Sequence, residues 1–91
     1  MLGNGTVYPF EAKWNEVPGV YAIFNSKMQL LYIGQTDNFK RRMSEHRGNL
    51  EHDMHRYGPV YVEAEVVRDE TTRCMKERAL INSHQPPCNR C

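Results

Sequence analysis

The sequence lacks several features that would assign the chain to a functional class at once. Its 12 Lys and Arg residues are nearly balanced by 11 Asp and Glu, which gives a formal net charge of +1. No overall positive field therefore indicates a nucleic-acid partner, and any such binding must come from a local basic patch. No apolar run approaches the roughly 18 residues of a membrane span, and the polar start lacks the apolar segment of a signal peptide. We expect an intracellular protein.

Cysteine is scarce as well. Cys74, Cys88 and Cys91 cannot all pair within one chain, and in a reducing compartment they remain thiols or bind a metal, so a disulfide scaffold is disfavoured. The spacing His84-x-x-x-Cys88-x-x-Cys91, with Cys74 one helix earlier, suits tetrahedral zinc. A set divided between a helix end and a chain terminus nevertheless matches the usual zinc-finger patterns poorly. Ordinary thiols are the favoured interpretation, and a structural Zn²⁺ site is the alternative.

The 91 residues fit one domain, residues 1–91, without repeats or a linker. A chain of this length buries only about 60–65% of its unfolded surface, so we expect an open active site rather than a deep cavity. The hydrophobic content of 40% and the charged content of 25% are typical of a globular protein and argue against disorder.

A β-hairpin signature occupies residues 19–34. Two runs rich in β-branched and aromatic residues, 20–24 and 30–33, flank the polar turn 25–28. If Phe24 pairs with Gln29, Tyr21 lies directly opposite Tyr32, and both hydroxyls are on one face. A one-residue slip would send them to opposite faces.

The remaining segments predict an α+β domain with a small three-stranded antiparallel sheet flanked by α-helices, in the order β-β-α-β-α. Residues 1–17 are interpreted as an irregular lead-in whose aromatic residues cover an edge of the core, and 18–89 as the core of the domain. The expected elements after the hairpin are a helix capped by Thr36 or Asp37 that runs to about Arg47, a strand from Val60 to Val67, and a helix that begins within 69–72 and ends near Ser83.

Three polar side chains on these helices are candidates for chemistry. Arg42 and His46 lie at positions i and i+4, so they share one side of the first helix. Glu77 lies at the margin of an apolar stripe on the second helix, where an unpaired carboxylate is costly and needs a cation. Each is individually more typical of a solvated helix surface, and His52 and His55 are interpreted as polar surface.

Taken in order, these residues resemble a known family over residues 18–89. The resemblance is to the GIY-YIG nucleases, and Val20 stands where the family name has Ile. It implies a small antiparallel sheet with flanking helices, and a single metal-binding carboxylate. The matching positions are Gly19-Val20-Tyr21, Tyr32-Ile33-Gly34, Arg42, His46, Glu77 and Asn89.

The implied activity is a divalent-metal-dependent endonuclease that hydrolyses DNA phosphodiester bonds with one ion. Glu77 would hold a hydrated Mg²⁺ or Mn²⁺, since Mg²⁺ binds through one or two carboxylates and keeps several waters. Arg42 would contact the scissile phosphate, and Tyr32 a water or phosphate oxygen. Tyr21 would act as the base or orient the water if Arg42 and the metal lower its pKa, with His46 receiving the proton.

Substrate contacts are expected outside this group. Lys40, Arg41 and Arg47 would contact the DNA backbone without reading its sequence. Asn89, grouped with these substrate-binding residues, would orient the site and perform no chemistry. Many relatives attach a separate DNA-binding domain, for which this length leaves no room, so a protein partner or a homodimer is expected to supply specificity. The alternative is a non-catalytic module that keeps the fold and binds nucleic acid or a partner protein.

Overall fold

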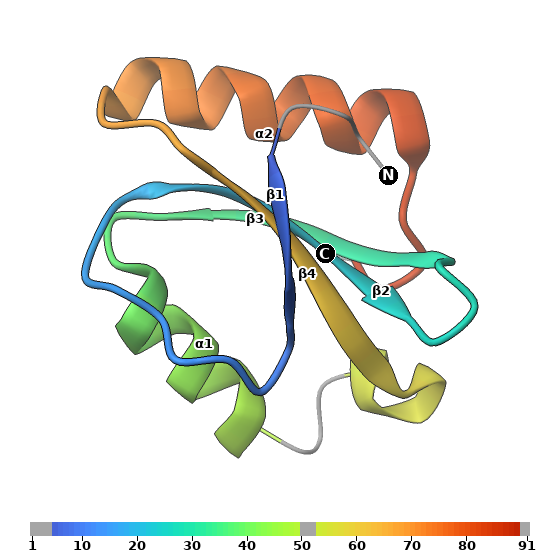
Figure 1. The fold of residues 1–91 in the computed structure, drawn as a ribbon. Coiled ribbons are helices and arrows are strands. Elements are labelled where there is room, and N and C mark those ends of the chain that lie inside the picture. The colour runs from blue at the N-terminus through green and yellow to red at the C-terminus, as the bar shows by residue number, and fades with distance from the viewer. Residues whose placement is uncertain (1–4, 50–52, 90–91) are drawn as a thin grey trace.

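The computed structural model describes residues 5–49 and 53–89 (Figure 1). The elements follow one another as β1 (Thr6–Pro9), β2 (Gly19–Asn25), β3 (Leu30–Thr36), α1 (Phe39–Gly48), the short 3-10 helix η1 (Asp53–Tyr57), β4 (Pro59–Val66) and α2 (Glu70–His84). No helix among the described residues is long and apolar enough to cross a membrane.

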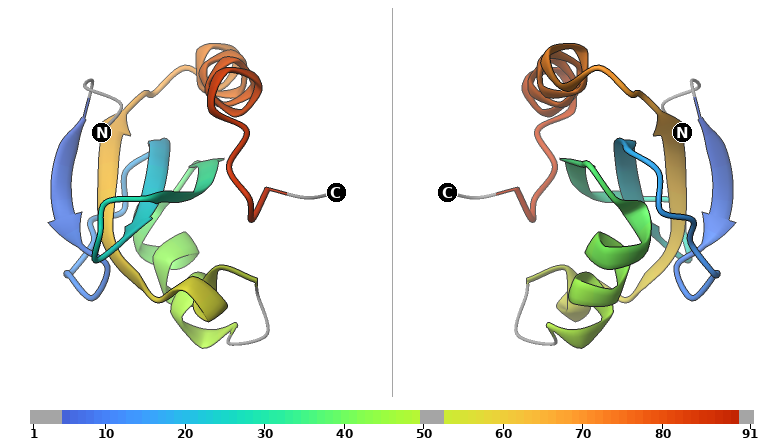
Figure 2. Two further views of the ribbon diagram at one scale, coloured as in Figure 1. Left: turned by 90° about the vertical axis from the view of Figure 1, so that its right-hand side faces the viewer. Right: turned by 90° about the vertical axis from the view of Figure 1, so that its left-hand side faces the viewer.

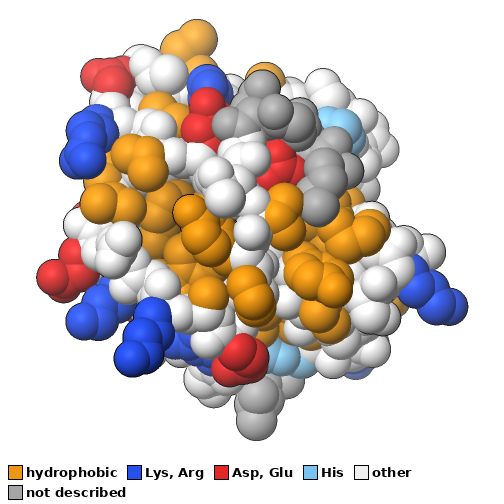
Figure 3. Space-filling model, viewed as in Figure 1, with side chains coloured by type: hydrophobic (Ala, Val, Ile, Leu, Met, Phe, Trp, Pro, Cys, Tyr) orange, Lys and Arg blue, Asp and Glu red, His pale blue; other side chains and the backbone are white. Residues whose placement is uncertain are grey.

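The sheet is antiparallel and has the strand order β1-β4-β2-β3. The predicted α+β class is confirmed, but the prediction of three strands is wrong, because β1 lies within the expected irregular lead-in. This strand has only four residues, all exposed, and ends at a proline. Such a strand carries no alternation of buried and exposed positions, and it forms because β4 offers it an open edge. Figure 3 shows hydrophobic side chains gathered on the side of the molecule where β1 lies. Among the residues of β1 and β4, Val7, Tyr8 and Val66 are exposed.

The two helices cover opposite faces of the sheet (Figure 2). On one face, the predicted buried residues Phe39 and Met43 of α1 pack against Tyr21 and Ile23 of β2. On the other, Leu80 and Ile81 of α2 pack against a smaller cluster formed by Ala22, Phe24 and Ile33. Because side chains alternate along a strand, β2 supplies both cores, and all seven of its residues are buried.

The hairpin register differs from the predicted one by two residues. Tyr21 pairs with Gly34 and Ile23 pairs with Tyr32, so the expectation that Tyr21 lies directly opposite Tyr32 is wrong. Because the side-chain period of a strand is two, this shift leaves both tyrosines on the same face, as the argument from the two hydroxyls required.

The turn explains the register. The side-chain oxygen of Asn25 accepts hydrogen bonds from the backbone N–H groups of Lys27 (3.0 Å) and Gln29 (2.9 Å). Met28 adopts the left-handed conformation with φ 61°. The pairing of β2 with β3 is irregular between Ile23 and Phe24, as in a β-bulge. Turn and bulge together set a register that the hydrophobic pattern alone does not specify.

Both long helices begin at capping residues. Asn38 caps α1 and accepts a hydrogen bond from the backbone N–H of Arg41 (3.1 Å), so the predicted caps Thr36 and Asp37 are wrong. Thr36 instead accepts a hydrogen bond from the Asn38 backbone (3.1 Å) and orders the segment before the helix. The second helix begins after Asp69, which lies within the predicted range.

Candidate active site

The centre of the site is a hydrogen bond between β2 and α1. The hydroxyl of Tyr21 lies 2.7 Å from Nε2 of His46, and both side chains are almost fully buried. Their rings meet edge to face, with centroids 5.6 Å apart. A hydroxyl and an imidazole at this distance can exchange a proton directly, which is the geometry that a proton relay needs.

Tyr32 completes the aromatic group and is less buried. Its ring stacks on Tyr21 with centroids 6.1 Å apart and an interplanar angle of 28°, and it meets the edge of the His46 ring at 5.2 Å. The predicted trio of Tyr21, Tyr32 and His46 is therefore brought together. Tyr21 and His46 are buried in the α1 face of the sheet, whereas Tyr32 lines an open cleft.

This polar cleft has a volume of about 490 Å³ and extends between α1 and α2. Arg42 and Glu77, the two predicted charged residues, are both part of its wall. The cleft is lined by Tyr32, Gln35, Thr36, Asp37, Arg41, Arg42, Glu45, Glu70, Arg73 and Glu77.

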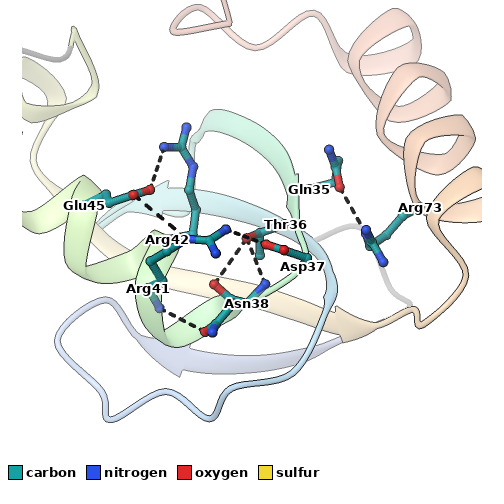
Figure 4. Close-up of polar contacts among 8 residues, drawn as sticks. All are labelled: Gln35, Thr36, Asp37, Asn38, Arg41, Arg42, Glu45 and Arg73. Carbon is teal, nitrogen blue, oxygen red and sulfur yellow. Dashed lines mark hydrogen bonds and ion pairs between the residues drawn. The ribbon is translucent and has the colours of Figure 1, made fainter.

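Arg42 lies half-exposed at the α1 side of the polar cleft. Its Nη1 atom donates a hydrogen bond to Oε1 of Glu45 at 3.2 Å (Figure 4). Burial lowers the pKa of Arg42, but the hydroxyls of Tyr21 and Tyr32 and the Glu45 carboxylate more than offset this effect, so the pKa lies above its usual range. Arg42 is a permanent cation beside both phenols.

The pKa of Tyr21 lies well above its usual range. Burial has the largest effect, and the neighbouring phenol of Tyr32 adds to it, whereas the guanidinium of Arg42 acts in the opposite direction. The lowered pKa that a tyrosinate base requires is therefore not produced by Arg42. The 2.7 Å contact with His46 offers the proton of Tyr21 an acceptor instead.

Glu77 lies half-buried on α2 at the opposite side of the polar cleft. Burial raises its pKa, while hydrogen bonding by the backbone of Gln35 and the charges of Arg78 and Arg42 oppose this rise. A carboxylate oxygen is a preferred ligand of Mg²⁺, and an open cleft leaves room for the waters that Mg²⁺ retains. Glu77 therefore fits a hydrated divalent cation held by one carboxylate.

The described residues do not form a site of several His, Cys, Asp or Glu ligands, such as zinc uses. Within residues 5–49 and 53–89, no group of three or more His, Cys, Asp and Glu side chains could hold a metal ion. Cys88 is buried in the core, and its backbone N–H donates a hydrogen bond to the Leu31 carbonyl at 3.0 Å. Cys74 is half-buried, whereas Cys91, which belongs to the alternative zinc set, lies outside the described residues.

Asn89 is held at the free edge of β3, next to Tyr32. Its Nδ2 donates to the carbonyl of Ile33 and its Oδ1 accepts from the Ile33 N–H, both at 2.7 Å. The side chain thus pairs with the strand as another strand would. This geometry fixes the segment after α2 against β3, the strand that carries Tyr32.

The predicted DNA contacts are distributed unevenly. Arg41 lines the polar cleft but forms ion pairs with Asp37 and Glu45. Lys40 is exposed. Arg47 points elsewhere, since its Nη1 atom donates to the carbonyls of Phe10 (3.4 Å) and Ala12 (3.1 Å). The structure gathers Arg41 with Arg42 and does not bring Arg47 to the cleft.

Two residues near the site were not identified from the sequence. His55 was interpreted as polar surface, but its Nε2 lies 2.8 Å from the backbone carbonyl of His46, to which it can only donate. Arg73 is 6% exposed and bonds to Gln35. Neither has a sequence signal, because η1 has no regular pattern and Arg73 resembles any helix arginine. His52 lies outside the described residues.

The family model for the GIY-YIG catalytic domain matches residues 17–90. Curated relatives include the UvrABC system protein C of Christiangramia forsetii, 36% identical over 77 residues, and that of Acinetobacter baumannii, 34% identical over 82 residues. These alignments cover 79% and 86% of this chain but only 13% and 14% of the relatives, so the chain spans about a seventh of their length.

Solved structures show the same fold. The magnesium-bound GIY-YIG N-terminal endonuclease domain of UvrC from Thermotoga maritima superposes with a TM-score of 0.73 at 25% identity, covering 85% of this chain and 88% of that one. A point mutant of that domain, bound to its catalytic divalent cation, gives 0.73 at 28% identity, with 86% and 88% coverage. With a family match over most of its length and the site residues grouped as described, the chain belongs to the GIY-YIG catalytic-domain family.

Proposed function

We propose that this domain is a divalent-metal-dependent endonuclease that hydrolyses DNA phosphodiester bonds by a one-metal mechanism. The observation that carries the proposal is the hydrogen bond between Tyr21 and His46 beneath a cleft whose two sides present Arg42 and Glu77. This arrangement supplies a proton acceptor, a phosphate-binding cation and a metal-binding carboxylate within one small volume. The endonuclease activity of the T. maritima relative supports the same reading.

The chain's own residues divide the work of hydrolysis. A bound Mg²⁺ or Mn²⁺ on Glu77 would act as a Lewis acid at the phosphate. Arg42 binds a phosphoryl oxygen with its planar fork of donors and stabilises the negative charge that develops during attack. Tyr32, at the wall of the polar cleft, holds the attacking water or a phosphate oxygen.

Tyr21 and His46 move the proton. Because burial raises the pKa of Tyr21, a preformed tyrosinate is unfavourable at neutral pH. Tyr21 instead accepts the proton of the water as its own proton passes to Nε2 of His46, 2.7 Å away. The water oxygen bonds to phosphorus as the bond to the 3′ oxygen breaks, and the 3′ oxygen leaves with the electron pair and takes a proton from solvent in the open cleft. His55 favours this transfer by fixing the backbone of His46.

The partners in this proposal are DNA and a second protein component, either another protein or a second copy of this chain. The polar cleft carries four carboxylates, Asp37, Glu45, Glu70 and Glu77, against the three guanidinium groups of Arg41, Arg42 and Arg73. Such a cleft attracts a polyanion weakly, so specificity and affinity are supplied from elsewhere. The two relatives described above belong by name to the UvrABC system, which supports a partner-dependent nuclease.

One assay tests the proposal. The protein is incubated with supercoiled, branched and single-stranded DNA in the presence of Mg²⁺ or Mn²⁺, beside Glu77→Gln. We expect cleavage of at least one substrate by the wild type and none by Glu77→Gln, because the amide keeps the shape and loses the charge. Binding without cleavage by a folded wild type, at every concentration, would favour the non-catalytic module.

A further inference from the structure

Arg73 is an almost completely buried arginine on α2, one helical turn before Glu77. Its Nε atom donates a hydrogen bond to Oε1 of Gln35 at 3.0 Å, as Figure 4 shows. Its Nη1 atom reaches the carbonyls of Arg68 (3.3 Å) and Val67 (3.5 Å), in the connection from β4 to α2. One guanidinium thus joins three segments: the end of β3, the β4–α2 connection and α2 itself.

Gln35 also contacts Glu77 through its backbone. Along the free edge of β3, the carbonyl of Leu31 accepts from the Cys88 backbone, and Ile33 pairs with Asn89. Gln35 comes two residues later on the same edge, so its backbone faces outward in the same direction. The hydrogen bonding of this backbone to Glu77 helps to lower the pKa of the carboxylate against the effect of burial.

Arg73 and Glu77 therefore contact two parts of one residue. Positions i and i+4 of a helix are neighbours on one face. On α2, Arg73 binds the side chain of Gln35, and the Glu77 carboxylate is hydrogen-bonded by the backbone of Gln35. The arginines whose charges lower the pKa of Glu77 are Arg78 and Arg42. Arg73 instead contacts β3 and the β4–α2 connection through hydrogen bonds to neutral oxygens.

We propose that Arg73 is a positioning residue for Glu77, which it serves through Gln35. The pair fixes the end of β3 against α2 and so sets where the Glu77 carboxylate presents its oxygens to a divalent cation. This inference rests on the proposed function in one respect, namely that Glu77 holds the cation. Residues that orient a metal-binding side chain typically change metal affinity by about 10-fold to 100-fold when they are replaced.

A positioning role and a purely electrostatic role of Arg73 predict opposite changes in cation affinity when Arg73 is replaced. Loss of a positive charge near a cation site should strengthen cation binding if charge alone matters. Loss of the Arg73–Gln35 contact should weaken binding, because the carboxylate is less well placed. A variant of the uncharged Gln35 separates the two explanations further, since it should weaken binding without any change of charge.

The experiment measures Mn²⁺ binding to the purified protein by electron paramagnetic resonance, without DNA. The variants are Arg73→Met, Gln35→Ala and their combination, with Arg68→Met as the control, because Arg68 is an exposed arginine in the β4–α2 connection. We expect each single variant to raise the Kd for Mn²⁺ about tenfold. The double variant should bind Mn²⁺ no more weakly than the single variant with the higher Kd, and Arg68→Met should have the Kd of the wild type.

Thermal unfolding of each variant identifies loss of structure. If Arg73→Met does not fold, Gln35→Ala decides, because Gln35 is only half-buried. Glu77→Gln should abolish Mn²⁺ binding. If it does so while the folded Arg73 and Gln35 variants bind Mn²⁺ as tightly as the wild type or more tightly, the positioning role is overturned. If Glu77→Gln binds Mn²⁺ like the wild type, the proposed function itself fails.

Discussion

Gly34 faces Tyr21 across β2 and β3, and the phenol of Tyr21 occupies the space that a side chain at position 34 would need. A Cβ atom on Gly34 would overlap both the hydroxyl and the ring carbon that bears it. The absence of a side chain at this position is what allows the hydroxyl to reach His46. The glycine of the Tyr32-Ile33-Gly34 motif is thus explained by packing, without appeal to a special backbone conformation.

Gly34→Ala should therefore destabilise the domain and displace Tyr21 from His46. Overpacking of a core typically costs about 1–3 kcal/mol, and chemical denaturation measures this loss. Gly48→Ala is the matched control, because a Cβ atom there meets nothing within 4 Å. The control should be neutral or slightly stabilising, since alanine favours a helix more than glycine does. Equal stability of the two variants would contradict this account of the motif.

Tyr21→Phe tests the proton relay. The ring and its packing remain, while the hydroxyl that reaches His46 is lost, so we expect cleavage to fall by about 100-fold or more. Removing one partner of this buried hydrogen bond should cost about 1–3 kcal/mol of stability. Single-turnover cleavage at a saturating protein concentration, together with urea denaturation, separates the two effects. Cleavage at the wild-type rate would remove Tyr21 from the mechanism.

The raised pKa of Tyr21 also predicts alkaline destabilisation. In the unfolded chain Tyr21 ionises near its ordinary pKa of about 10, whereas in the folded protein burial keeps it protonated to higher pH. Above about pH 10 the unfolded state therefore binds fewer protons, so stability falls as the pH rises. Urea denaturation from about pH 9 to about pH 11, a range around this pKa, measures the effect. The free energy of unfolding should fall less over this range for Tyr21→Phe than for the wild type. Tyr57→Phe, at an exposed position, should follow the wild type.

The faces of the hairpin were predictable from the sequence, but its register was not. Alternation with a period of two places Tyr21 and Tyr32 on one face in any register that differs by an even number of residues. The exact pairing depends on the side chain of Asn25 and on the left-handed Met28, which are properties of the turn. The family resemblance, which rested on the ordered motif positions, is confirmed by the family match.

Features that depend on tertiary pairing escaped sequence reasoning. The strand β1 forms on the edge of β4, which is distant in sequence, and nothing in Thr6–Pro9 indicates it. His55 and Arg73 acquire their contacts from chain reversals that bring η1 to His46 and α2 to Gln35. Helix caps lie between these cases, because Thr36, Asp37 and Asn38 are all suitable residues, and the local hydrogen bonds select Asn38.

Arg42 and Arg41 should differ in what their loss changes. Arg42 lies beside the two phenols, whereas Arg41 is paired with Asp37 on the exposed side of α1. Arg42→Ala should lower the cleavage rate much more than DNA binding, because an interaction that strengthens in the transition state appears in turnover. Arg41→Ala should mainly weaken binding and reduce its salt dependence. Fluorescence anisotropy and single-turnover rates measure both, and equal effects of the two variants on both quantities would leave Arg42 as an ordinary backbone contact.

Glu45 should limit access of DNA to Arg42. Its carboxylate accepts a hydrogen bond from Nη1 of Arg42 at 3.2 Å and so occupies the donors that a phosphate would use. Glu45→Gln removes this competing charge and one of the four carboxylates of the polar cleft, so DNA should bind several-fold more tightly at low salt, with a smaller gain at high salt. Because the ion pair is half-exposed, its loss should change stability by less than about 1 kcal/mol.

The control for Glu45→Gln is Glu11→Gln, which makes the same change of charge at an exposed position that does not line the polar cleft. If both variants bind DNA equally more tightly, the gain reflects net charge alone. A gain confined to Glu45→Gln, and lost again in the double variant with Arg42→Ala, assigns the effect to the release of Arg42. Anisotropy titrations of the wild type, Glu45→Gln, Arg42→Ala and the double variant at two salt concentrations give this double-mutant cycle directly, and Glu11→Gln is titrated beside them.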